Sequence, residues 1–181
     1  MRIIGGKFGG LRLNPPANLP VRPTTDIAKE ALFNILGNRI DFENSVCLDL
    51  FAGTGNISLE LASRGAQQVD AVDIHFKCLS YISETAKKLQ TAQIKTRKAD
   101  VLKFIVSAKG TYDFIFADPP YDLGVLPQLG NNILEKGLLR EGGIMVIEHP
   151  SMRKMLESPY LVDIRKYGYS SFSFYELPKT I

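Results

Sequence analysis

The chain is poor in the residues that build metal centres and disulfide frameworks. Its 181 residues include two cysteines and two histidines. Cys47 and Cys78 lie 31 positions apart, a spacing that matches no common metal-ligand motif. We therefore expect two buried free thiols, no metal site and a reducing compartment, the cytoplasm. His75 and His149 are interpreted as structural or peripheral side chains.

Long apolar segments are also missing. No run approaches the roughly 20 residues that a membrane span requires. The leading MRIIGGKFGG lacks the apolar region of a secretory signal. The composition, 45% hydrophobic and 23% charged, is that of an ordinary globular protein. We therefore expect residues 1–181 to form one domain with a sizeable core, without a membrane partner.

The net charge of +3 comes from the first part of the chain. Residues 1–30 contain two acidic side chains and five basic ones, which are Arg2, Lys7, Arg12, Arg22 and Lys29. Glycines and prolines fill residues 1–23, so short β pieces over residues 2–4 and 11–13 and a glycine turn predict a hairpin-like arm. A basic arm is typical of segments that contact phosphates, although a solvated tail has the same charge.

After this arm the pattern alternates between strands and helices. A helix is expected to begin at Thr24 or Thr25, with an apolar stripe made of Ile27, Ala31, Leu32, Ile35 and Leu36. Strands are predicted over residues 46–51, 69–74, 94–98, 112–117 and 143–148, and helices over 57–63, 76–90, 101–108, 126–136 and 152–156. Residues 161–167 and 170–176 predict a closing antiparallel hairpin. The chain is therefore expected to be an α/β protein with a mostly parallel sheet and a mixed edge.

The first predicted strand ends in a glycine turn, LDLFAGTG, over residues 48–55. Such a turn lets the backbone approach a bound ligand closely. A P-loop would end in Gly-Lys-Ser/Thr, which is absent. A dinucleotide fingerprint would place a third glycine where Ser58 stands. The turn therefore favours a ligand other than a nucleotide pyrophosphate.

Aspartates stand at the ends of the first three predicted strands. Asp49 can accept a charge-assisted hydrogen bond from the ammonium of an amino acid. Asp73 is placed to bind ribose hydroxyls, and Asp100 to bind an adenine amino group. Each aspartate alone is equally consistent with a helix cap or a loop charge. Together they indicate S-adenosylmethionine.

The tetrapeptide Asp118-Pro119-Pro120-Tyr121 follows the predicted strand 112–117. Prolines cannot continue a central strand, so the chain leaves the sheet at the carboxyl end, where α/β proteins bind ligands. The Asp118 carboxylate and the Pro119 carbonyl can accept hydrogen bonds from an exocyclic base amine, and Tyr121 can stack on the base. A base must be unpaired or flipped to reach this turn. A plain turn with a packed tyrosine is the alternative.

These motifs resemble one family along nearly the whole chain. RIIGGKFGGLRL, RPTTDIAKEALFNIL, LDLFAGTG, DPPY and YGYSSFSFYE are similar to the RsmD family of bacterial 16S ribosomal RNA guanine-N2 methyltransferases. The resemblance implies a Rossmann-like class I methyltransferase fold, with a seven-stranded mostly parallel sheet and an antiparallel C-terminal hairpin. It further implies S-adenosylmethionine as cofactor and rRNA, preferably in assembled 30S particles, as substrate. We also expect the protein to be a monomer. Residues 1–40 would form an RNA-contacting arm and helix, and 41–181 the catalytic core.

The resemblance also assigns site residues by position. The catalytic loop would be Asp118, Pro119, Pro120 and Tyr121, and the cofactor site would comprise Asp49, Phe51, Gly53, Gly55, Asp73, Ile74, Asp100 and Val101. The substrate-contacting set would be Arg2, Lys7, Arg12, Arg22 and Thr24. Asp73 departs from the family pattern, which more often has glutamate.

Three other functions remain open from the sequence. A DNA adenine-N6 methyltransferase shares the DPPY chemistry but generally needs a target-recognition insert. A protein-glutamine methyltransferase typically begins this loop with asparagine. A ribosome-assembly factor that binds RNA without catalysis is a third, which the intact DPPY disfavours.

Overall fold

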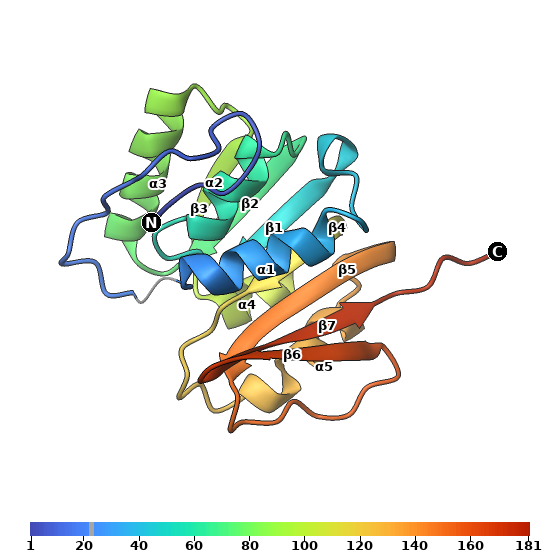
Figure 1. The fold of residues 1–181 in the computed structure, drawn as a ribbon. Coiled ribbons are helices and arrows are strands. Elements are labelled where there is room, and N and C mark those ends of the chain that lie inside the picture. Colours follow the sequence, from blue (N-terminus) through green and yellow to red (C-terminus); the bar gives the residue numbers. More distant parts are fainter. Residues whose placement is uncertain (22–23) are drawn as a thin grey trace.

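The computed structural model describes residues 1–21 and 24–181. Strands β1 (Val46–Leu50), β2 (Gln68–Asp73), β3 (Ile94–Lys98), β4 (Tyr112–Ala117) and β5 (Leu139–Pro150) run parallel to one another. Strand β7 (Ser170–Glu176) pairs antiparallel with both β5 and β6 (Leu161–Tyr167). The mostly parallel sheet with an antiparallel C-terminal hairpin is therefore confirmed (Figure 1).

The strand order of the sheet determines where a ligand can bind. The order is β3-β2-β1-β4-β5-β7-β6. The chain therefore adds β2 and β3 on one side of β1, and then β4 and the later strands on the other side. The connections that follow β1 and β4 therefore diverge and leave a crevice between them. In open α/β sheets ligands bind in this crevice, beyond the carboxyl ends of the strands.

Helices cover both faces of the sheet (Figure 1). On one face, α1 (Asp26–Leu36) and α2 (Asn56–Ser63) pack on strand residues such as Phe114 and Phe116, and α3 (Phe76–Leu89) packs on Ala71 of β2. On the other, α4 (Val101–Ser107), the 3₁₀ turn η2 (Leu126–Gln128) and α5 (Leu129–Glu135) pack on Ile115 and Ala117. A further 3₁₀ turn, η1 (Phe42–Asn44), precedes β1. Alternate residues of β4 are thus buried on opposite faces, which explains why its sequence is apolar almost throughout.

Two elements after the arm differ from their predicted ranges by several residues. Residues 152–156 form no helix, because the Leu156 amide donates to the Pro127 carbonyl at 3.0 Å instead of to a carbonyl one turn back. Strand β5 begins at Leu139 rather than at residue 143, since Leu139 already pairs with Tyr112 ahead of a register shift. Both differences arise from hydrogen bonds between segments distant in the sequence.

Helix α1 buries most of its predicted apolar stripe, including Leu32 and Leu36, but not its first residue. Thr25 is its N-cap, and its hydroxyl accepts a hydrogen bond from the Ala28 amide at 3.3 Å. Ile27, expected in the apolar stripe, is 80% exposed, whereas the Lys29 side chain is fully buried. Lys29 Nζ lies 3.0 Å from Glu60 Oε2 on α2. Lys29 therefore belongs to the core and not to a basic surface.

The N-terminal arm lies against α2. Arg2 and Arg12 form an antiparallel bridge, so the expected hairpin is present but contains no regular strands. The amides of Ile4 and Gly5 donate to the buried Glu60 carboxylate at 2.8 and 2.9 Å. One buried carboxylate thus joins the arm to both α1 and α2.

The two thiols are free and buried, as expected. Burial raises the pKa of Cys47 to about 12 and that of Cys78 to about 11, so both are unreactive at neutral pH. No helix in the described part of the chain is long and apolar enough to cross a membrane.

Candidate functional site

A cavity of about 840 Å³ opens at the carboxyl ends of the strands, around the crevice between β1 and β4. Its lining comes from the segments that follow β1, β2, β3, β4 and β5, from the segment before α1, and from the β6–β7 turn. Small-molecule sites in proteins commonly measure roughly 300–1,000 Å³. The cavity is therefore large enough for a nucleoside-sized ligand together with part of a second molecule.

The turn after β1 is built from residues in the left-handed region. Phe51, Gly53 and Gly55 have φ angles of 60°, 56° and 77°. A phenylalanine in this region is strained by roughly 1–2 kcal/mol, and Phe51 lines the cavity. Gly53 also lines the cavity, but Gly55 does not; a Cβ at Gly55 would lie 2.6 Å from Ile82 Cγ1. Gly55, expected to contact cofactor, instead allows the turn to pack on α3.

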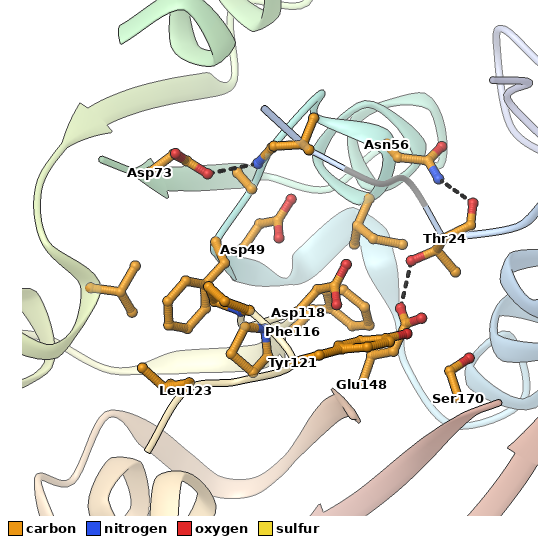
Figure 2. Close-up of a pocket in the computed structure, with 18 of the residues that line it drawn as sticks. Thr24, Asp49, Asn56, Asp73, Phe116, Asp118, Tyr121, Leu123, Glu148 and Ser170 are labelled. Atoms are coloured by element: carbon orange, nitrogen blue, oxygen red, sulfur yellow. Dashed lines mark hydrogen bonds between the residues drawn. The ribbon is translucent and has the colours of Figure 1, made fainter. Parts of the chain in front are cut away.

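Asp49 lies at the floor of the cavity with 1% of its surface exposed (Figure 2). Its Oδ2 accepts hydrogen bonds from the Ser58 amide at 3.0 Å and from the Ser58 hydroxyl at 2.6 Å. Burial raises the pKa of Asp49 to about 7, the Ser58 hydrogen bonds oppose this rise, and the charge of Asp73 adds to it. This carboxylate gains stabilisation from any cation that enters the cavity.

Asp73 and Asp100 line the cavity and also hold the backbone. Asp73 Oδ2 accepts from the Gly53 amide at 2.9 Å, and its Oδ1 accepts from the His75 amide at 2.8 Å. Asp100 is the N-cap of α4 and accepts from the Lys103 amide at 3.2 Å. A carboxylate oxygen can accept more than one hydrogen bond, so capping leaves capacity for a ligand. Ile74 and Val101, both expected at the cofactor, also line the cavity.

The Asp118–Tyr121 loop continues from β4 directly into the cavity, and all four of its residues line it. The Asp118 amide donates to the Leu50 carbonyl at 3.2 Å, which prolongs the β1–β4 pairing by one residue before the prolines end it. Arg153 Nη1 donates to the carbonyls of Tyr121 and Leu123 at 2.9 and 2.8 Å. Arg153, in the segment predicted as a helix, therefore fixes the loop from outside.

Asp118 has a second carboxylate beside it. Ala117, the last residue of β4, is in register with Ile147 of the parallel strand β5, so the next residues, Asp118 and Glu148, lie side by side. Both project to the face of the sheet that buries Phe116, because side chains alternate along a strand. The Thr24 hydroxyl donates to Glu148 Oε2 at 2.5 Å (Figure 2).

The two carboxyl groups disfavour each other's ionisation. Burial raises the pKa of Asp118 well above its ordinary range, and the charges of Glu148 and Asp49 raise it further. Burial also raises the pKa of Glu148, against the hydrogen bonds from Thr24 and Ser170. Ligand groups that donate hydrogen bonds to both carboxylates are therefore favoured here.

Glu148 is the site residue that sequence reasoning missed. It is the last residue of the predicted strand 143–148, and Asp49 and Asp73 lie within two residues of the ends of theirs, so the same rule would have selected it. Glu148 lies near Asp118 only because β5 is next to β4 in the sheet, and the strand order is not readable from the local sequence.

The expected substrate-contacting residues fall into separate places. Thr24 lines the cavity, whereas Arg2, Lys7 and Arg12 do not. Arg22 lies outside the described residues. The Lys7 amide donates to the carbonyl of Ser63 at the last residue of α2, and the cavity contains Asn56 at its first. The arm tip is therefore displaced from the cavity by roughly 10 Å along the helix.

Comparisons with known proteins agree on one family. The family described as "Conserved hypothetical protein 95" matches residues 1–176. The "Putative rRNA methyltransferase YlbH" of Bacillus subtilis is 34% identical, over 97% of this chain and 98% of that protein. The "Ribosomal RNA small subunit methyltransferase D" of Escherichia coli is 29% identical, over 82% of this chain and 74% of that protein.

Solved structures show the same fold along nearly the whole chain. The "Putative methyltransferase yhhF" of Escherichia coli superposes with a TM-score of 0.85 at 25% identity, covering 99% of both chains. A hypothetical protein of Thermus thermophilus has a TM-score of 0.82 at 30% identity, covering 98% of this chain and 99% of that one. An RNA methyltransferase from Salinibacter ruber, solved with S-adenosyl-L-homocysteine, shares the fold at 16% identity and a TM-score of 0.65, covering 88% of this chain and 96% of that one.

Proposed function

Because the chain belongs to the RsmD family, described as "Conserved hypothetical protein 95", we propose that it methylates the exocyclic N2 amine of a guanine in small-subunit ribosomal RNA. Its methyl donor is S-adenosylmethionine, and its substrate is the rRNA of the assembled 30S particle. One observation carries the proposal: a single cavity contains the aspartates at the ends of β1 and β2 and before α4, together with the whole Asp118–Tyr121 loop.

The residues of the cavity fit S-adenosylmethionine by the chemistry of their side chains. Asp49 is a buried carboxylate suited to an ammonium group, and Asp73 and Asp100 are acceptors for ribose hydroxyls and an adenine amine. Ile74 and Val101 supply apolar surface for a flat base. When bound, the cofactor supplies an electrophilic methyl group on a sulfonium.

The remainder of the cavity suits an amine acceptor. The Asp118 carboxylate makes no side-chain hydrogen bond to any described residue, so it can accept one from an N–H of the base. A second N–H can be accepted by the Pro119 carbonyl. These bonds hold the nitrogen lone pair out of conjugation and stabilise the positive charge that develops during transfer. Tyr121, which is 40% exposed at the rim, can stack on the base.

Methyl transfer with product analysis tests the proposed function. The protein is incubated with methyl-labelled S-adenosylmethionine and, separately, 30S particles lacking the modification, naked 16S rRNA or DNA, and the nucleosides are then analysed. The expected result is label in N2-methylguanosine from 30S particles. Label in N6-methyladenosine would identify an adenine methyltransferase instead. Binding to 30S particles without any labelled product would indicate an assembly factor.

A further inference from the structure

The acceptor end of the cavity holds two carboxylates where amine binding alone would need one. Asp118, directly after β4, lies beside Glu148 of β5, and both face the same side of the sheet. Glu148 is 4% exposed yet lines the cavity, and the Thr24 hydroxyl donates to its Oε2 (Figure 2). This hydrogen bond orients the Glu148 carboxylate, which retains lone pairs for a ligand.

The edges of the amine-bearing bases differ in what lies beside the amine. Adenine presents ring-nitrogen acceptors on both sides of its N6 amine, and cytosine presents the acceptor N3 beside its N4 amine. Guanine alone has a ring donor, N1–H, next to its N2 amine. Enzymes that act on a flipped base read this edge by hydrogen bonds. Two adjacent acceptors therefore match two adjacent donors, and among these bases only guanine has them.

We propose that Glu148 is the specificity-determining residue of the acceptor site: its carboxylate accepts the N1–H of the target guanine while Asp118 accepts the N2 amine. This inference rests on the proposed function and adds the base-reading residue to it. Against adenine or cytosine, the Glu148 carboxylate faces a ring lone pair and has no proton to accept. Thr24 acts as a positioning residue, because it touches Glu148 and holds its orientation.

A Glu148→Gln variant tests this assignment with almost no change of shape. With its oxygen held by the Thr24 hydroxyl, the amide presents N–H to the cavity, which suits a ring acceptor. Guanosine and 2-aminopurine riboside both have a 2-amino group, but only guanosine has N1–H. Their dissociation constants are measured by calorimetry on protein saturated with S-adenosylhomocysteine. The matched control is Glu84→Gln on α3, an exposed glutamate outside the cavity.

We expect wild type and Glu84→Gln to prefer guanosine, and Glu148→Gln to shift the ratio toward 2-aminopurine riboside by at least about tenfold, the worth of one discriminating contact. On 30S particles the variant should lose roughly ten- to hundredfold in kcat/KM, with S-adenosylhomocysteine affinity within about twofold of wild type.

Failure of the base-reading role and failure of the proposed function give different results. Glu148 does not read N1–H if Glu148→Gln leaves both kcat/KM and the ratio of the two nucleoside dissociation constants unchanged. The same holds if the variant lowers affinity for the two nucleosides equally. Either result leaves the proposed function intact as long as the wild-type product is N2-methylguanosine. If the nucleosides bind too weakly to titrate, the kcat/KM of Glu148→Gln on 30S particles is the test: an unchanged value contradicts the base-reading role. A wild-type product other than N2-methylguanosine overturns the proposed function itself.

Discussion

At the scale of single residues, Asp118 is half-buried in the cavity wall, and its side chain accepts no hydrogen bond from any described residue. We expect Asp118→Ala to lower kcat by roughly 10²–10³, the effect of removing one group that stabilises transition-state charge. Affinity for S-adenosylhomocysteine should stay within about twofold, because Asp118 faces the acceptor. Single-turnover methyl transfer and calorimetry measure the two quantities. An equal loss of cofactor affinity would place Asp118 in the cofactor site instead.

Asp49 should make cofactor binding depend on pH. Its pKa of about 7 is raised above the ordinary value of 3.8 by burial, with the Asp73 charge adding to the rise. Only the ionised form pairs with an ammonium, so affinity for S-adenosylhomocysteine should rise roughly tenfold between pH 6 and pH 8. Titration calorimetry across this range is the measurement. Asp49→Asn should bind more weakly and show a flat profile.

The same residue should affect stability in the opposite direction. Because the folded-state pKa of Asp49 is raised, its protonated form stabilises the free protein fully below about pH 3.8, and this contribution is lost as pH rises through 7. The free energy of unfolding of Asp49→Asn should therefore exceed that of wild type most clearly at pH 8. Urea denaturation at pH 6 and pH 8 compares them. A difference independent of pH would show that Asp49 is already ionised when the cavity is empty.

At the scale of elements, α1, α2 and the arm meet at one buried ion pair. Glu60 receives Lys29 from α1, Arg64 one turn along α2 at 2.9 Å, and two amides of the arm. This contact places the segment before α1, with Thr24, at the cavity. The local sequence of α1 could not predict the burial of Lys29, because a lysine in a surface helix normally faces water.

Removing the lysine should destabilise the protein strongly. We expect Lys29→Met to lower the free energy of unfolding by about 3 kcal/mol or more, since it leaves the buried Glu60 carboxylate without its one fully buried cation among the described residues. Urea denaturation measures the loss, and faster proteolysis within residues 1–13 should accompany it. Lys109→Met, at an exposed loop lysine, is the control with an expected change below about 0.5 kcal/mol. A loss under about 1 kcal/mol for Lys29→Met would contradict the role of the ion pair.

Most elements were predictable because their signals are local. The bounds of β3, β4, β6 and β7 match the predicted ranges; β1, α2, α3 and α4 differ by one residue at one end, and β2 by one residue at both. Apolar periodicity, glycine turns and prolines determine such elements within a few residues of sequence. The helix prediction for 152–156 was wrong because the Leu156 amide pairs with Pro127 of η2 and the Arg153 side chain with the Tyr121 carbonyl, both far away in the chain.

At the scale of the whole molecule, RNA must contact both the cavity and a surface beside it. Lys7 and Arg12 are exposed on the arm, outside the cavity. Lys29 is buried, so it cannot contact RNA phosphates. We propose that the arm holds phosphates flanking the flipped base.

Replacing both arm cations should change the salt dependence of RNA binding. Lys7→Ala with Arg12→Ala should weaken binding to a 16S rRNA fragment and reduce the slope of log K against log salt by roughly 1.4, at about 0.7 per phosphate contact on single strands. Filter binding over a salt series gives the slope. Lys109→Ala with Lys136→Ala removes the same charge from exposed positions after α4 and α5 and should leave the slope unchanged. Equal slopes for the two double variants would exclude the arm from phosphate binding.

The sequence by itself determined the alternation of strands and helices, the exit of the chain from β4 at Asp118, and the acidic ends of the strands. These features follow from backbone dihedral limits and from periodicity, which depend on neighbouring residues. Only the tertiary structure decided that Glu148 lies beside Asp118, that Lys29 is buried against Glu60, and that the arm tip lies away from the cavity. Strand order and burial depend on contacts between residues far apart in the chain, which local patterns do not contain.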